Sequence, residues 1–343
     1  MAEHIKIEYF ISLSARFPVI DVRAPSEYAQ GHIPGALNIP LFDDQERKVV
    51  GTAYKQINKE AAMYAGLDFA GKKLVKLAKE GERAAGKKHT LLVHCWRGGM
   101  RSKSMVWLFE TMGIHCYLLE GGYKSYRSYV RKVLAFPLNL LVIGGRTGSG
   151  KTVILHQLRK SGEQIIDLEG LAHHKGSAFG ALGEPNQPST EQFENELCRE
   201  ILRLDSEKVC WIEDESRNVG KCVIPVELYS RMKEADLVFL DIARELRATH
   251  LVRDYAQYKQ EDLRSCVLKI EKRLGGDRTR EALESIDRED YFQTAMITLH
   301  YYDKAYMFSL EKNHERYRIL SSADVDPEIN AQLLISYEKE RRL

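Results

Sequence analysis

The sequence has no run of about 18 uninterrupted apolar residues, the length that a membrane-crossing helix needs, and this absence excludes a helical membrane protein. It also lacks a basic N-terminal segment followed by an apolar stretch, so we expect a cytoplasmic protein. Cysteine is scarce: the six residues form no C-x-x-C pair, and most lie in apolar runs such as residues 209–212. They are therefore expected to be reduced core thiols, which excludes a disulfide framework and a zinc site.

What the chain does have is enough length and apolar content for two domains. A chain of 343 residues, 44% of them hydrophobic, can bury about two separate cores. The net charge of +2 conceals an uneven distribution, because residues 72–132 contain 14 Lys or Arg against four Glu and no Asp. Such an excess predicts a polyanionic partner, and a solvated lysine-rich helix face is the alternative.

Short apolar strands alternate with helical patterns in both halves of the chain, which predicts an α/β protein with two parallel sheets covered by helices. Phe136-Pro137 interrupts this alternation, so we place one domain at residues 1–137 and the second at residues 138–343. A charged, tyrosine-rich helical region, residues 244–310, is expected to form a lid or docking surface on the second domain. Expected strands in the two halves are residues 19–22, 90–94, 116–119, 138–143, 165–167, 209–212 and 237–240; expected helices are residues 72–80, 102–112, and helices beginning at Thr152 and Thr190.

A cysteine lies where an apolar strand ends and a helix begins, in the segment His94 to Ser102. At a helix N-terminus the free backbone amides point into the loop, and together with Arg101 they favour a bound anion and the thiolate form of Cys95. The glycines let successive amides converge on one point. We therefore predict Cys95 as a nucleophile in an anion-binding loop. The loop residues are Trp96, Arg97, Gly98, Gly99, Met100 and Arg101.

The second half begins with the pattern G-x-x-x-x-G-K-T between a strand and a helical pattern, which predicts a phosphate-binding loop. Its residues are Gly145, Arg146, Thr147, Gly148, Ser149, Gly150, Lys151 and Thr152. The backbone is expected to wrap a di- or triphosphate, Lys151 to neutralise its terminal oxygens, and the Thr152 hydroxyl to bind Mg²⁺. The pattern leaves open whether the ligand is ATP, GTP or another diphosphate.

Acidic residues end two strands of the second half, where a metal-positioning or acid–base carboxylate is expected. Asp167 and Glu169 follow one strand, and Glu213 and Asp214, with Glu215 beside them, follow another. The alternative is that each of these carboxylates is a solvent-exposed residue at the end of a strand, with no role in a site.

The first half resembles the rhodanese-like domains. The resemblance lies in Asp21-Val22-Arg23-Ala24-Pro25-Ser26-Glu27-Tyr28, in residues 31–36 (GHIPGA) and in residues 38–40 (NIP), followed by the cysteine loop. In that family the first elements are chiefly structural and the cysteine carries the transferred sulfur. The loop here is longer than is usual for sulfur transfer, and His-Cys-x5-Arg-Ser is also the signature of cysteine-dependent phosphatases. A loop of this size is expected to hold a tetrahedral phosphate-like anion.

The pairing of a rhodanese-like domain with a phosphate-loop domain is similar to the tRNA 2-selenouridine synthase family. Residues 95–102, 167–172, 176–180 and 211–217 carry this resemblance. It implies a transferase that replaces sulfur by selenium at C2 of the wobble 2-thiouridine of tRNA. It further implies selenophosphate as selenium donor, a selenium-loaded Cys95, and a geranylated intermediate made from geranyl diphosphate held by the phosphate loop.

The same resemblance implies tRNA as partner, with residues 72–132 as part of its binding surface, and a selenophosphate-producing enzyme as a further partner of a monomeric protein. Trp96 and Tyr123 are candidates to stack on an extruded base, with packing against the loop as the alternative. The rival functions are a cysteine-dependent phosphatase, a sulfurtransferase with a nucleotide-binding domain, and a non-catalytic RNA-binding protein gated by a nucleotide.

Overall fold

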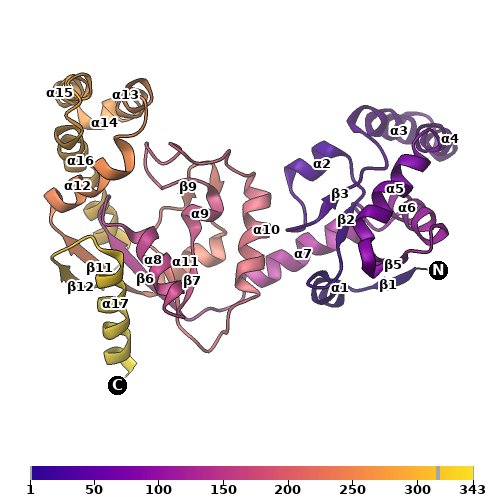
Figure 1. Cartoon of the computed structure of the whole chain (residues 1–343), viewed down its shortest axis with the longest axis horizontal. Coiled ribbons are helices and arrows are strands. Elements are labelled where there is room, and N and C mark those ends of the chain that lie inside the picture. Colours follow the sequence, from indigo (N-terminus) through magenta and orange to yellow (C-terminus); the bar gives the residue numbers. More distant parts are fainter. Residues whose placement is uncertain (1, 314–316, 343) are drawn as a thin grey trace. The chain divides into compact units, whose positions relative to one another are not determined.

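The computed structural model describes residues 2–313 and 317–342, and the chain divides into two compact units, residues 1–133 and 134–343 (Figure 1). The predicted domain boundary after Pro137 lies just beyond the end of helix α7 (Gly122–Leu134). Each unit contains one five-stranded parallel sheet, as expected for the α/β class.

The sheet of unit 1 has the strand order β1-β5-β4-β2-β3, with every neighbouring pair parallel. Its strands are β1 (Glu3–Ile5), β2 (Val19–Asp21), β3 (Leu37–Asn38), β4 (Thr90–His94) and β5 (His115–Leu119). Strand β4 is central and almost wholly buried, which explains why it reads as a continuous apolar run. The loop that contains Cys95 therefore leaves the sheet from its central, buried strand.

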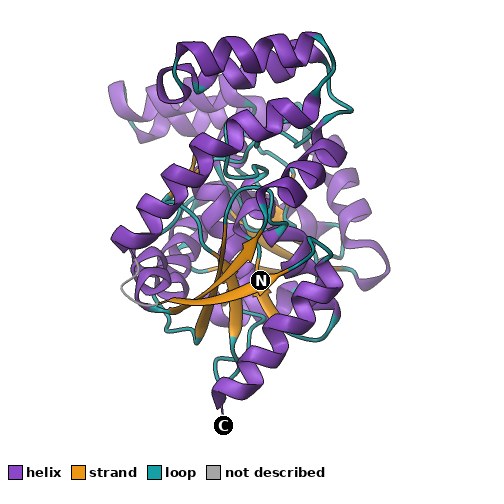
Figure 2. Ribbon diagram, turned by 90° about the vertical axis from the view of Figure 1, so that its left-hand side faces the viewer, coloured by secondary structure: helices purple, strands orange, loops and turns teal. Residues whose placement is uncertain are grey.

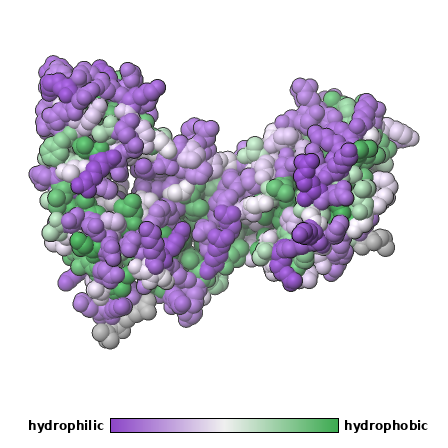
Figure 3. Space-filling model, viewed as in Figure 1, coloured by the Kyte–Doolittle hydropathy of each residue, from purple (hydrophilic) through white to green (hydrophobic). Residues whose placement is uncertain are grey.

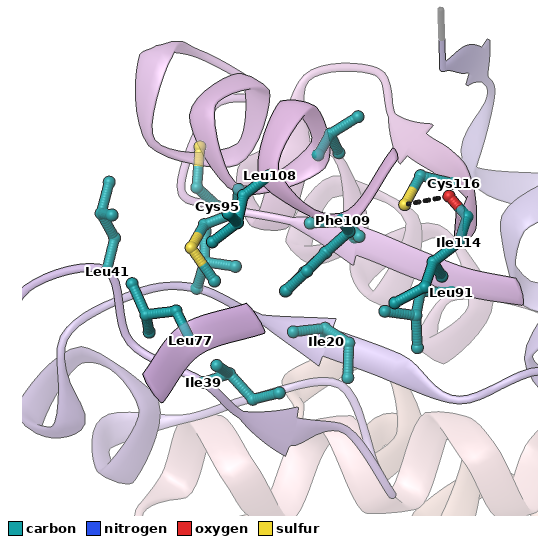
Figure 4. Packing of buried hydrophobic residues seen from close by; sticks show 14 of the residues in the cluster. Ile20, Ile39, Leu41, Leu77, Leu91, Cys95, Leu108, Phe109, Ile114 and Cys116 are labelled. Atoms are coloured by element: carbon teal, nitrogen blue, oxygen red, sulfur yellow. Dashed lines mark hydrogen bonds between the residues drawn. The ribbon is translucent and has the colours of Figure 1, made fainter. Parts of the chain in front are cut away.

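The helices of unit 1 cover both faces of this sheet. They are α1 (Ile7–Ser14), α2 (Pro25–Gln30), α3 (Asp44–Gln56), α4 (Lys59–Gly71), α5 (Leu74–Ala85), a short 3-10 turn (Gly86–Lys88), α6 (Met100–Thr111) and α7. The core between α5, α6 and the sheet includes Ile20, Leu91 and Phe109 (Figure 4). The helices expected near residues 72–80 and 102–112 are present as α5 and α6, whereas α3 and α4 were not predicted.

Unit 2 has the strand order β12-β11-β6-β8-β7, again all parallel. Its strands are β6 (Leu140–Gly145), β7 (Gln164–Ile166), β8 (Cys210–Glu213), β11 (Asp236–Ile242) and β12 (Tyr317–Ser322), and a small antiparallel hairpin is formed by β9 (Asn218–Val219) and β10 (Cys222–Val223). Helices α8 (Lys151–Lys160), α9 (Leu168–Ala172), α10 (Thr190–Ile201) and α11 (Val226–Glu234) belong to the same unit. Strand β6 lies at the centre and leads into the phosphate loop.

The tyrosine-rich segment forms a helical region on unit 2 with an apolar core of its own, built around Val267, Ala282 and Ile286. It consists of α12 (Arg244–Tyr255), α13 (Gln260–Lys269), α14 (Glu271–Leu274), α15 (Gly276–Asp287) and α16 (Tyr291–Asn313). Figure 2 shows these helices gathered beyond the strands of the sheet, and Figure 3 shows hydrophilic side chains over the outer surface of α13 and α15. The region expected to be a lid or docking surface is thus a helical subdomain whose residues line one pocket together with the phosphate loop.

The chain ends with an element pair that the sequence did not reveal. Strand β12 adds to the edge of the sheet beside β11, and helix α17 (Pro327–Arg342) packs through Ala331 and Leu334 into the core around Ile154 and Leu158 of α8. The last described helix therefore supports the helix that follows the phosphate loop.

Candidate active sites

Cys95 lies between β4 and the first turn of α6, with its sulfur facing that helix. The Sγ atom accepts a hydrogen bond from the Gly99 amide at 3.3 Å and lies 3.1 Å from the Ser102 hydroxyl oxygen. Only 3% of the residue is exposed, and its side chain lies among core residues that include Leu77 and Leu108 (Figure 4). The thiol is thus held at the base of the cysteine loop, residues 95–101, where two polar groups contact it.

The loop backbone is held in its curve by the turn that follows β5. Gly98 has φ +66°, and a Cβ atom there would lie 2.8 Å from the carbonyl oxygen of Leu119; a Cβ at Gly122, with φ +59°, would lie 2.4 Å from that of Cys95. Any residue other than glycine would therefore be strained at both positions. Within the described residues, the amides of Trp96, Arg97 and Gly98 donate to no protein acceptor, so they are available to an anion.

Arg101 is not a free cation, because it forms an ion pair with Glu27 of α2. Burial on its own would raise the pKa of Glu27, but the hydrogen bonds and positive charge of Arg101 outweigh it and hold that pKa below its usual value. The guanidinium is consequently oriented by a carboxylate that stays ionised. The position of Arg101 in the loop follows from the motif, whereas its partner Glu27 does not, although Glu27 lies in the rhodanese-like segment.

Behind the loop lies a buried polar group that contains Asp21, Arg23 and His94, each with no exposed surface. The Arg23 Nη2 atom donates to Asp21 at 2.6 Å, and the guanidinium lies 3.7 Å from the centroid of the Tyr123 ring. Burial lowers the pKa of His94, with Asp21 acting in the opposite direction, so this imidazole is neutral near pH 7. Tyr123 is fully buried against Arg23, in agreement with the packing alternative, whereas Trp96 is 37% exposed.

The phosphate loop forms the expected strand–loop–helix turn between β6 and α8. Gly148 and Gly150 have φ +82° and +74°, conformations that favour glycine. The Lys151 ammonium donates to the Gly145 carbonyl at 3.0 Å. The Gly145 amide donates at 3.0 Å to the hydroxyl of Tyr306, which in turn donates to Asp214 at 2.9 Å. Helix α16 thus holds the start of the loop through Tyr306, a residue that the motif does not reveal.

Three carboxyl groups gather beside Thr152, whose hydroxyl donates to Glu169 at 2.6 Å and lies 3.4 Å from Glu213. Glu169 also forms a hydrogen bond with Glu215, which requires that one of these two carboxyls be protonated. Burial raises the pKa of Glu213 well above its usual range, and the neighbouring carboxylates raise it further. Burial, assisted by the Glu169 charge, raises the pKa of Glu215 to about 8. The cluster therefore carries less negative charge than its composition suggests.

The other two predicted carboxylates have different partners. Asp167 caps α9 by accepting from the Gly170 amide at 2.7 Å and lies 2.6 Å from the His156 ring. Asp214 is bound by Tyr306 and by the Lys233 ammonium at 2.8 Å. The structure therefore brings Glu169 and Glu213 to Thr152 and engages Asp167 and Asp214 elsewhere.

The residues around Thr152 suit Mg²⁺ in the chemistry of their donors, because hydroxyl and carboxylate oxygens are its preferred ligands. Within the described residues, however, no three acidic, histidine or cysteine side chains are arranged to hold a metal ion. Such an ion would need most of its ligands from bound phosphates and water, which is usual for magnesium.

A pocket of about 1170 Å³ connects the phosphate loop with the helical region of unit 2. Its lining includes the phosphate loop with Glu169 and Glu215, and the aromatic and aliphatic residues Phe179, Tyr255, Tyr258, Tyr302, Leu263 and Ile270. Charged side chains such as Lys175, Lys269 and Arg273 also line it. The composition of residues 244–310 indicated many tyrosines, but their convergence on the phosphate loop appears only in the fold.

Comparison with known proteins identifies both units. Residues 8–129 match the rhodanese-like domain family, and residues 138–331 match the family described as the tRNA 2-selenouridine synthase AAA domain. A tRNA 2-selenouridine synthase of Shewanella frigidimarina is 34% identical over 345 residues, covering 90% of this chain and 93% of that protein. The chain belongs to the tRNA 2-selenouridine synthase family.

Two further curated relatives carry the same name. Proteins of the same name from Pseudomonas putida and Bdellovibrio bacteriovorus are 33% and 34% identical, over 89% and 87% of this chain and 91% and 90% of theirs. The crystal structure of an N-terminal domain from Clostridium difficile 630 is 40% identical over 37% of this chain and 98% of that one, with a TM-score of 0.36. Membership of the tRNA 2-selenouridine synthase family makes the chain an enzyme of the transferase class.

Acidic side chains partly neutralise the excess of Lys and Arg in residues 72–132 of the folded chain. Lys72 pairs with Asp68 at 2.7 Å, Lys73 pairs with Glu46, and Arg101 pairs with Glu27. All three acids precede residue 72 in the sequence, so counting charges in one stretch overstates the local field. Among the described helices, none is both long and apolar enough to span a bilayer.

Proposed function

We propose that this protein is a tRNA 2-selenouridine synthase that replaces sulfur by selenium at C2 of the wobble 2-thiouridine, with selenophosphate as selenium donor and Cys95 as nucleophile. The observation that carries the proposal is the cysteine loop: one thiol at the base of a curve whose amides at residues 96–98 have no other acceptor among the described residues. Such a cradle suits a tetrahedral anion beside a nucleophilic sulfur. The Cys95 thiolate has two possible points of attack on selenophosphate, the selenium atom and the phosphorus atom. The family resemblance implies a selenium-loaded Cys95.

The phosphate loop is assigned to geranyl diphosphate, which supplies the geranyl group of the intermediate. The pocket supports this choice, because its lining combines the phosphate loop with apolar and aromatic side chains that include Leu263, Ile270 and several tyrosines. Lys151 neutralises the diphosphate. Thr152 and Glu169 would hold Mg²⁺, which helps a diphosphate to leave from carbon when it is bound.

Transfer RNA is the substrate of both proposed reactions, geranylation at the phosphate loop and selenium transfer at the cysteine loop. The remaining lysines and arginines of residues 72–132 supply part of its binding surface, so binding weakens as salt rises. Trp96 beside Cys95 is exposed enough to contact a base. By this proposal the monomeric protein acts in the cytoplasm, where tRNA is found, and receives selenophosphate from the enzyme that makes it.

The test is mass spectrometry of tRNA nucleosides from cells that lack this protein, with complementation by the wild-type chain or by Cys95→Ala. We expect 2-selenouridine to be absent from the deletion strain, restored by the wild type, and not restored by Cys95→Ala. A Cys116→Ala variant is the matched control, because Cys116 is a buried thiol of the same unit that lies outside the cysteine loop. Persistence of 2-selenouridine in the deletion strain would refute the proposal.

A further inference from the structure

We infer that four cations which line the pocket of unit 2 form a second RNA-binding surface, where they hold the backbone of the anticodon loop while the wobble base enters the pocket beside Tyr301. The four cations, called the α12–α14 surface below, are Arg253, Lys269, Lys272 and Arg273. This inference rests on the proposed function for the identity of the RNA. It goes beyond that function, which places tRNA only on residues 72–132 of unit 1.

Geranyl transfer requires the base to come to unit 2. In this step the C2 sulfur of the base forms a bond with the geranyl carbon that carries the diphosphate. The carbon–oxygen bond breaks, its electron pair leaves with diphosphate, and the N3 proton of the base passes to water. The sulfur and the carbon must lie about 3–3.5 Å apart before the step. Because the phosphate loop holds the diphosphate, a base that reacts there must leave its stack and enter the same pocket.

Only some of the cations that line this pocket have a partner in the protein. Lys151 donates to the Gly145 carbonyl within the phosphate loop. Lys175 pairs with Glu184 at 3.5 Å, and the Lys233 ammonium lies 2.8 Å from the carboxylate of Asp214. The four cations of the α12–α14 surface, in contrast, form no ion pair with any acidic side chain in the part of the chain that the structure describes. They are therefore available to an anionic ligand.

The α12–α14 surface suits a polyanion that is longer than a diphosphate. All four of its side chains are exposed, and they come from three consecutive helices of the region seen in Figure 1. Arg253 lies in the last turn of α12, Lys269 ends α13, and the other two belong to α14. A diphosphate is a compact ligand that the phosphate loop already serves. An RNA backbone carries one charge on each successive phosphate, so it can use several separate cations at once.

Tyr301 connects this surface with the aromatic part of the lining. The Arg273 Nη1 atom donates to the Tyr301 hydroxyl at 3.3 Å, and the centroids of the Tyr301 and Tyr302 rings are 5.1 Å apart. Tyr301 is half-buried and lines the pocket. Tyr306, which binds the first residue of the phosphate loop, lies five residues further along α16, a rise of about 7.5 Å along the helix axis. A half-buried ring this near the loop is suited to stack on an unstacked base.

The test is the binding of an anticodon stem–loop RNA to the full-length protein. The RNA carries 2-thiouridine at the wobble position and a fluorescein label, and fluorescence anisotropy is measured at several salt concentrations without selenophosphate or geranyl diphosphate. Each contact to a phosphate of a single strand contributes about 0.7 to the slope of log K against log salt concentration, so loss of all four should reduce the slope by about 3. The test variant combines Arg253→Gln, Lys269→Gln, Lys272→Gln and Arg273→Gln.

The matched control removes four exposed cations of the same helical region that do not line the pocket, and its slope should change by less than about 1. These substitutions are Lys259→Gln, Arg278→Gln, Arg280→Gln and Arg288→Gln. Pyrophosphate binding at physiological salt, measured by calorimetric titration, should stay within about 3-fold of wild type in both variants because salt screens exposed charges. A wild-type slope in the test variant would overturn the inference, as would an equal loss in the control. Loss of pyrophosphate binding in the test variant would instead assign the four cations to the diphosphate site and would also overturn it.

Tyr301 tests the position of the base independently of charge. Tyr301→Ala should weaken binding of the stem–loop about 5- to 100-fold because the stacking ring is lost, whereas Tyr301→Phe keeps the ring and should bind within about 2-fold of wild type. Unchanged affinity in Tyr301→Ala would contradict the entry of the base beside this residue. The nucleoside measurement in cells tests the proposed function separately, because RNA binding is measured here without either donor.

Discussion

Glu27 of α2 forms an ion pair with Arg101 at the first turn of α6, across 74 residues of sequence. The pair places a carboxylate beside the entrance of an anion-binding loop, where it opposes the approach of anions while orienting the guanidinium. Its removal should therefore change how the loop discriminates between charged and neutral reagents.

In Glu27→Gln, we expect alkylation of Cys95 by the anion iodoacetate to speed up about 3- to 10-fold relative to alkylation by neutral iodoacetamide. The ratio of the two rates is measured by peptide mass spectrometry, which cancels general changes in thiol access. Glu82→Gln removes the same charge from an exposed site on α5 and should leave the ratio unchanged. An unchanged ratio in Glu27→Gln would show that the carboxylate does not influence the loop.

Asp21→Asn should destabilise unit 1 by about 3–5 kcal/mol, because it leaves the buried Arg23 guanidinium without its anionic partner. Burial on its own would raise the pKa of Asp21, but the hydrogen bonds and positive charge of Arg23 act against burial and the pKa lies below 3.8, with His94 contributing only where its imidazole is protonated. The ionised carboxylate thus stabilises the fold above pH 3.8, and this stabilisation is lost as the pH falls through the lowered value.

Hydrogen exchange of peptides from β4 measures this change in a unit-specific way. The difference between wild type and Asp21→Asn should be full at pH 7 and shrink only in strong acid. Asp68→Asn removes an exposed ion pair with Lys72 and should cost no more than about 1 kcal/mol. Equal effects of the two substitutions would contradict the assignment of the buried pair as a structural support of the loop.

Tyr306→Phe removes one hydroxyl that holds both the Gly145 amide and the Asp214 carboxylate. We expect unit 2 to lose about 1–3 kcal/mol, since both partners lose a buried hydrogen bond, and we expect pyrophosphate to bind more weakly in calorimetric titration. Tyr337→Phe, in α17, is the control for loss of a tyrosine hydroxyl. Undiminished pyrophosphate binding in Tyr306→Phe would mean that α16 does not support the phosphate loop.

Lys151→Ala should weaken pyrophosphate binding about 10- to 100-fold, because a charged hydrogen-bond donor to phosphate is lost. Geranylated tRNA should disappear, whereas the reaction of Cys95 with selenophosphate should continue. Lys160→Ala, at the exposed end of the same helix, should preserve both. Geranylation that survives in Lys151→Ala would refute the division of labour between the two loops.

The parts of the fold that sequence predicts best are those where local signals and burial agree. Strand β4 is buried on both faces and is followed by glycines and a helix, so residues 90–112 were placed closely. Helices α3 and α4 escaped prediction because several of their large apolar residues face outward. Tyr54, Tyr64 and Leu67 are all more than 60% exposed, which leaves no clear apolar stripe to detect.

In the sites, too, the sequence predicts residues that form a local motif and does not predict their remote partners. Both loops are contiguous motifs, so Cys95 and Lys151 could be assigned their positions from spacing alone. Their supporting partners are remote: Tyr306 is 161 residues from Gly145, and no spacing rule connects them. Carboxylates at strand ends were all equivalent in the sequence, and only packing separates Glu169 and Glu213 from Asp167 and Asp214.

Gly122 affects the affinity of the cysteine loop for anions. Because its backbone lies against the Cys95 carbonyl without room for a side chain, the turn after β5 fixes the loop's shape before any ligand arrives. The ordering entropy of the cradle is then part of the folding reaction, and an incoming anion loses only its own freedom and its hydration. Substituting this glycine would transfer that entropic cost to the binding step, although Gly122 itself lies outside residues 95–101.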